Sequence, residues 1–187
     1  LIYTGEQLQQ MGSTSYQWGK AFRLMADIDL QGTGMVIGEF NYRGDSRPFT
    51  GIFEGNGHTI SNLRLDSGNG HPTGLFGFIQ DPNAQVKDLG LIDPVVSISK
   101  EEDVGALVGF LSRGDVTACY VDGGVVDGSS LVGGLIGSNG GGTVTKSYVN
   151  AKVTGIDTVG GLVGQNSGNV IQCYSDGTVD GAESVGG

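Results

Sequence analysis

The sequence VGALVG at 104–109 recurs as VGGLIG at 132–137 and as VGGLVG at 159–164, and VGG at 185–187 begins it once more. The starts of these segments are 28, 27 and 26 residues apart. A period of this length is typical of solenoid proteins, in which each repeat buries its apolar residues against its neighbours. The stretch 104–187 therefore determines the fold of the chain.

Each repeat contains two further apolar segments, separated from the first by glycine-rich turns. A valine is followed four positions later by a tyrosine, and then by a short Val-Asp-Gly or Val-Thr-Gly segment. The pairs are Val116 with Tyr120, Val144 with Tyr148 and Val170 with Tyr174. At ~3.3 Å per residue, a repeat of this length gives a circuit of about 90 Å, which suits a three-sided coil of parallel strands. We therefore predict an all-β fold, a right-handed parallel β-helix that forms a three-sided solenoid.

The N-terminal region differs from the repeats and predicts a cover for the open end of the solenoid. Thr4 is a suitable N-cap for a short helix that runs to Met11, and Gly12 is a stop signal. We expect Trp18 to pack over this end. The predicted organisation is a single β-helix domain over 1–187, with an N-terminal cap at 1–30, irregular coils at 31–103 and regular repeats at 104–187. The unfinished repeat at 185–187 suggests a fragment of a larger chain.

Composition restricts the class of partner. The chain has 20 acidic and 10 basic residues and a formal net charge of -10. This charge disfavours nucleic acid, which is bound through clustered Lys and Arg, and anionic lipid surfaces. No apolar run approaches the ~20 residues of a membrane-spanning helix, so we expect no direct membrane insertion.

Cys119 and Cys173 occupy the same position in two repeats, with Ser147 at that position in the repeat between them. If each repeat is one coil, the two cysteines lie two rungs of ~4.8 Å apart. That separation exceeds the Cα–Cα reach of a disulfide. We predict two free, inward-facing cysteines in one column with Ser147.

These motifs resemble the GLUG family of repeats. The matching segments are GLFG at 74–77, GLIG at 134–137 and GLVG at 161–164, and ALVG at 106–109 is a variant. The leader that runs to GNGHTI at 55–60 fits the family as well. The resemblance implies an extracellular β-helix of a bacterial surface or secreted protein, as in adhesins and in non-catalytic parts of immunoglobulin A peptidases. It transfers no catalytic residue and no cofactor, because His58 and His71 lie outside any HExxH frame.

Three groups of residues are candidate sites. Asp127 and Asp180 share one position of the repeat and are candidates for a surface metal ion, with Ca²⁺ the suitable cation. Two Arg-Gly-Asp tripeptides are candidates for binding a surface glycan or a protein ligand such as an integrin. They consist of Arg43, Gly44 and Asp45, and of Arg113, Gly114 and Asp115. The second tripeptide aligns with a turn of the last repeat, so turn chemistry also explains it.

Polysaccharide lyases and hydrolases also use the β-helix fold, and they place carboxylates beside basic residues on one flank. The residues of this kind are Lys87 with Asp88, and Glu101, Glu102 and Asp103 near Lys100 and Arg113. Their spacing does not separate them from an ordinary charged rim. The sequence therefore favours a non-catalytic module that acts in adhesion or as a rigid stalk. A β-helix that binds or degrades polysaccharide is the alternative.

Overall fold

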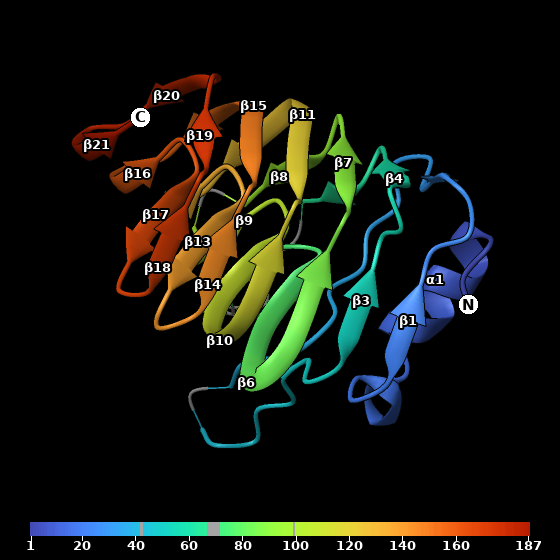
Figure 1. Ribbon diagram of the computed structural model, residues 1–187. Helices are drawn as coiled ribbons and strands as arrows, with labels where there is room; N and C mark the ends of the chain where they lie inside the picture. The colour runs from blue at the N-terminus through green and yellow to red at the C-terminus, as the bar shows by residue number, and fades with distance from the viewer. Residues whose placement is uncertain (42, 67–71, 99) are drawn as a thin grey trace.

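The computed structural model describes residues 1–41, 43–66, 72–98 and 100–187. In these residues the chain winds into a parallel β-solenoid of about six turns with three sheets (Figure 1). Every pairing between named strands is parallel, and the N-terminal helix and the last strand lie at opposite ends of the molecule. The predicted fold class is confirmed.

The strands are short because glycine and polar turns interrupt each repeat. The first sheet contains β1 (Ala21–Arg23), β3 (Ile52–Glu54), β6 (Phe76–Lys87), β10 (Val108–Thr117), β13 (Ile136–Asn139), β14 (Thr143–Thr145), β17 (Val163–Asn166) and β18 (Asn169–Ile171). The second contains β2 (Ile28–Asp29), β4 (Thr59–Ser61), β5 (Arg64–Leu65), β7 (Gly90–Ile92), β8 (Val95–Ser97), β11 (Tyr120–Asp127), β15 (Tyr148–Thr154), β19 (Tyr174–Ser175) and β20 (Thr178–Asp180). The third contains β9 (Glu102–Gly105), β12 (Ser130–Gly133), β16 (Asp157–Gly160) and β21 (Glu183–Gly186).

The register of the strands follows the alignment of the repeats. Val116 pairs with Val144 and Val144 with Val170, while Tyr120 pairs with Tyr148 and Tyr148 with Tyr174. Val116 and Val144 are fully buried in one column, whereas Val170, in the last coil, is 39% exposed. Stacking of equivalent residues thus supplies the core that no single repeat could bury alone.

The N-terminal end is closed by α1 (Gly5–Gly12) and the 3₁₀ turn η1 (Ser15–Gln17). The Thr4 side chain accepts a hydrogen bond from the Gln7 N–H, so the predicted N-cap is confirmed. Trp18 is 3% exposed and donates its indole N–H to the Met11 carbonyl at 3.1 Å. Residues 21–29 of the segment predicted as the cap also form β1 and β2, which pair with β3 and β4 of the next coil.

The glycine that ends each GLUG motif is required by space. A Cβ added at Gly77, Gly109, Gly137 or Gly164 would lie less than 3.0 Å from a backbone atom of another corner of the solenoid. None of these glycines has a positive φ. The last glycine of the motif therefore lies where two backbone segments approach closely, and this approach excludes any side chain at the position.

The corners of the coil use a different device, a single residue in the left-handed conformation. Many of these residues are not glycine, although each would be sterically easier as glycine or asparagine. They form three columns: Gln31, Asn62 and Asp93; Asp88, Ala118, Lys146 and Gln172; and Asp103, Leu131, Thr158 and Ser184, all with φ between 48° and 57°. The same bend repeated in every coil keeps the sheets in register.

Cys119 and Cys173 are free and lie in one column with Ser147, as predicted. The Cys119 N–H donates to the Ser147 hydroxyl at 3.1 Å, and the Ser147 N–H donates to the Cys173 sulfur at 3.4 Å. Burial raises the pKa of the Cys119 thiol to about 12, so this thiol stays protonated at neutral pH.

Candidate functional site

The candidate metal residues lie on the outer edge of the second sheet. Asp127 pairs in register with Thr154, and Thr154 with Asp180, so the two carboxylates are two rungs apart. Thr154 donates its hydroxyl to Asp127 at 2.6 Å. An open groove of about 340 Å³ runs beside all three residues. Within the described parts of the chain, no three His, Cys, Asp or Glu side chains gather in a way that could hold a metal ion.

Arg43, Gly44 and Asp45 lie in a loop that closes on itself. Glu39 and Arg47 form an antiparallel bridge at its base. The loop places Arg43 and Asp45 in solvent, and Gly44 has φ 104° with no atom within 4 Å of the position that a Cβ would take. This loop presents its tripeptide on an exposed, hydrogen-bonded turn.

Hydrogen bonds from Asn41 hold that turn. The Asn41 carbonyl accepts from the Gly44 N–H at 3.0 Å, and its side chain accepts from the Arg43 N–H at 2.9 Å. The Asn41 N–H donates to the Ser46 hydroxyl at 2.9 Å. An asparagine that accepts from the backbone two residues further on is a common way to stabilise a turn.

The second tripeptide is part of the first sheet. Arg113 is exposed, but Gly114 is buried at a bend of β10, and Asp115 pairs in register with Gln85 and Thr143. Gly114 has φ 105°, a conformation that favours glycine, and its α-carbon faces the Ala84 carbonyl. The alternative explanation by turn chemistry therefore accounts for the glycine at this position.

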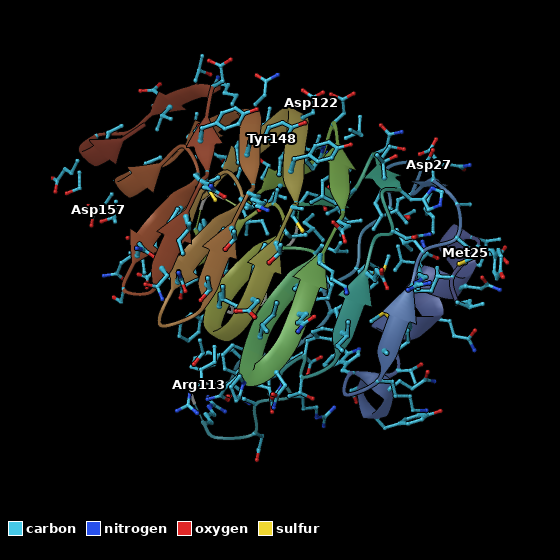
Figure 2. All side chains as sticks on the ribbon, viewed as in Figure 1. Met25, Asp27, Arg113, Asp122, Tyr148 and Asp157 are labelled. Carbon is cyan, nitrogen blue, oxygen red and sulfur yellow. The ribbon has the colours of Figure 1, made fainter. Side chains whose placement is uncertain are left out.

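The structure brings the two tripeptides to the same side of the molecule. Phe40 packs edge-on against Phe78 and Phe110, with ring centroids 5.0 and 5.9 Å apart, and Phe110 precedes Arg113 on β10. Figure 2 shows Arg113 on this side, beside the loop that carries the first tripeptide. Neither Arg43 nor Arg113 forms an ion pair with another described residue.

The residues predicted for polysaccharide chemistry lie at separate positions of the solenoid. Asp88 is exposed at a left-handed corner, and Lys87 occupies the last position of β6. Asp103 turns toward the solenoid and accepts a short hydrogen bond from the buried Ser138 hydroxyl. Desolvation, together with the nearby Glu102 charge, raises the pKa of Asp103. Among the described residues, Lys100 and Arg113 form no ion pair with Glu102 or Asp103.

His58 contacts another coil through its ring, whereas His71 lies outside the described residues. The His58 ring contacts the Asp27 carboxylate at 3.2 Å. Asp27 also accepts the Thr59 N–H at 2.9 Å, and this backbone hydrogen bond, followed by the one from His58, lowers the pKa of Asp27. These contacts join the first coil to the second.

A row of three stacked tyrosines on the second sheet was not predicted as a functional feature. Tyr120, Tyr148 and Tyr174 have ring centroids 5.0 and 5.2 Å apart and rings within 6° of parallel. Asp122 and Asn150 follow two residues later in β11 and β15, and Asp176 comes directly after β19. The signal was present in the sequence, because the tyrosine recurs at one position of every regular repeat. Figure 2 shows Tyr148 and Asp122 close together on the outer surface.

The architecture defines a solenoid repeat protein with in-register parallel coils. Residues 128–154 and 157–180 match the GLUG motif, so the chain carries GLUG repeats, as the sequence indicated. The chain is also 36% identical over 127 residues to halomucin of Haloquadratum walsbyi, a match that covers 63% of this chain. The matched part is 1% of the length of that relative. No solved structure matches the chain. Among the described helices, none is long and apolar enough to cross a membrane.

Proposed function

We propose that this chain is a non-catalytic module of a surface or secreted protein, in which it acts as a stiff stalk with an adhesive flank. The GLUG repeats and the similarity to halomucin support a surface or secreted location. The family resemblance supports an extracellular position at a bacterial cell surface. The partners are a surface glycan or a protein ligand.

The observation that carries the stalk function is the parallel register of the three sheets, which continues from coil to coil apart from shifts at Leu111–Asp115 and Asp122–Val125. From β9 onward, successive coils are hydrogen-bonded to one another in all three sheets. Bending such a rod would break backbone hydrogen bonds on one side. Because each coil is paired mainly with its direct neighbours, force applied along the axis is passed from one coil to the next.

Single-molecule stretching of the chain between its ends tests this function. We expect a series of force peaks, each releasing one coil of 26 to 28 residues and lengthening the chain by about 90 Å. Extension without resolved peaks would contradict the stalk function. The non-catalytic part of the proposal is tested by incubation with a panel of polysaccharides, where new reducing or unsaturated ends would favour the degrading enzyme.

A further inference from the structure

The outer face of β11, β15 and β19 carries two parallel rows of polar side chains, one residue per coil in each row. We call this surface the tyrosine face, and it consists of Tyr120, Tyr148 and Tyr174 in one row and Asp122, Asn150 and Asp176 in the other. Successive members of a row are one rung apart, ~4.8 Å. The surface is therefore periodic along the solenoid axis.

The tyrosine row presents neutral hydroxyl groups to solvent. Tyr174 is 60% exposed, and Tyr120 and Tyr148 are half-buried. The ring of Tyr120 lies over Gly90, where any side chain would collide with it, so the glycine makes room for the first ring. Desolvation, and then the charges of neighbouring groups, raise the pKa of Tyr148, which keeps its hydroxyl protonated as a donor.

The second row places negative charge at every other rung. Asn150 donates its side-chain N–H to Asp122 at 2.9 Å, and Asp176 is the next member of the row. Asp127 and Asp180, at the far edge of the sheet, are likewise two rungs apart. Each pair of carboxylates is thus separated by roughly 10 Å along the axis. Among the described residues, Lys152 is the one basic side chain between the row of Asp122 and Asp176 and the pair Asp127 and Asp180.

A ligand that matches this face is a linear polymer with a repeat close to one rung and a positive charge at every second unit. An extended chain of β-1,4-linked six-membered sugars advances by nearly one rung per sugar. Alternate sugars are turned over, so equivalent substituents recur at every second sugar. We propose that the tyrosine face binds a linear amino-sugar polymer along the solenoid axis, with ammonium groups at Asp122 and Asp176 and sugar hydroxyls at the tyrosine row.

This assignment deepens the adhesive part of the proposed function and rests on it. The acidic side chains of the second sheet would attract such a polymer, since surface carboxylates attract a polycation over a Debye length of ~10 Å at 0.1 M salt. The ring faces of the tyrosines are partly covered by one another, so hydroxyl contacts and charge provide the recognition.

Isothermal titration with glucosamine oligomers long enough to cross three rungs tests the proposal. The titration is carried out at about pH 5.5, where the sugar amines are protonated. We expect the wild-type chain to bind, and the double variant Asp122→Asn, Asp176→Asn to bind about tenfold more weakly. Tyr148→Phe keeps the stacked ring but loses one hydroxyl, and we expect a weakening of about threefold.

The matched control is the double variant Asp157→Asn, Glu183→Gln, which removes the same charge from the third sheet. We expect its affinity to stay within about twofold of wild type. An equal loss in both double variants, no binding by wild type, or equal binding of polylysine or of fully acetylated oligomers would overturn the proposal. The stretching experiment contains no glycan, so failure of binding and failure of the stalk function are separate results.

Discussion

At Gly137 the chain passes so close to the corner at Asp103 and Val104 that the α-carbon has room for a hydrogen and nothing larger. The same relation holds for Gly109 against Thr73 and for Gly164 against Leu131. The backbone atoms on the other side belong to paired strands and cannot move away without breaking ladder hydrogen bonds. The motif is thus a steric requirement repeated once per coil.

Gly137→Ala should therefore destabilise the chain by about 3 kcal/mol, because overpacking against fixed backbone costs more than overpacking against a flexible side chain. Urea unfolding followed by circular dichroism gives the free energy of unfolding. Gly141→Ala is the matched control, since its nearest neighbour, the Ser112 carbonyl, would lie 3.3 Å away. Equal losses in the two variants would show that glycine at 137 is not required by space.

Asp103 provides a pH-dependent prediction. Its folded-state pKa is raised, chiefly by desolvation, so the stability linked to this group is present below its unfolded pKa of about 3.9 and is lost as pH rises through the folded pKa. Asp103→Asn keeps an acceptor for Ser138 and suits the left-handed backbone at φ 55°. We expect this variant to be more stable than wild type at neutral pH, with the difference shrinking in acid. A difference in the free energy of unfolding that does not change with pH would contradict this explanation.

In β11, β15 and β19, the register determines which side chains of successive coils lie next to one another. The turn before each strand places residues 119, 147 and 173 in one column, directly before the stacked tyrosines. Ser147 lies between Cys119 and Cys173 in this column. Its hydroxyl donates to the Thr145 carbonyl at 3.0 Å. The two thiols are kept apart by one rung of chain.

Ser147→Cys should create a disulfide where the natural chain has none. The new cysteine would lie one rung, ~4.8 Å, from both neighbours, which is inside the Cα–Cα range of a disulfide. After mild oxidation and denaturation, thiol titration should find one thiol in this variant and two in wild type. Ser112→Cys lies outside the column and should retain all three thiols. Three thiols in Ser147→Cys would show that the register is wrong.

How far the sequence predicts the elements depends on whether their residues repeat. The valine, tyrosine and cysteine columns, and the hydrogen bond from Asn139 to Asn166 at 2.8 Å, follow from aligning the repeats. The packing of Phe40 against Phe78 and Phe110 does not, because the loop at 39–47 occurs once and its position depends on contacts far along the chain. Asp103 behaves in the same way, since its partner Ser138 lies 35 residues away.

The candidate sites also differ in whether their residues repeat. The shared position of Asp127 and Asp180 and the turn at Arg113, Gly114 and Asp115 are predictable from the repeat. The repeat does not predict that the tripeptides at 43–45 and 113–115 lie on the same side of the molecule, because this placement depends on tertiary contacts. The tyrosine row could be predicted as a column, but stacking of its rings depends on Gly90 leaving space for Tyr120.

The whole molecule carries an excess of negative charge that its ion pairs do not neutralise. The formal net charge is -10, and the ion pairs of the described residues, such as Arg23 with Glu54 and Arg64 with Asp66, lie at the surface. Surface pairs of this kind contribute about 0–1 kcal/mol each. Most acidic side chains therefore repel one another across a compact surface, and this repulsion disfavours the folded state relative to the expanded chain.

Salt should therefore stabilise the protein. Raising NaCl from about 0.01 M to about 1 M shortens the Debye length from ~30 Å to ~3 Å, which screens repulsion between distant carboxylates and weakens the few surface ion pairs. The repulsion is the larger effect because acidic residues outnumber basic ones twofold, so we expect Tm to rise by several degrees. The variant Glu102→Gln, Asp180→Asn, Glu183→Gln has three fewer negative charges and should show a smaller rise. A Tm that falls with salt, or an equal rise in this variant, would mean that net charge does not limit the stability of the solenoid.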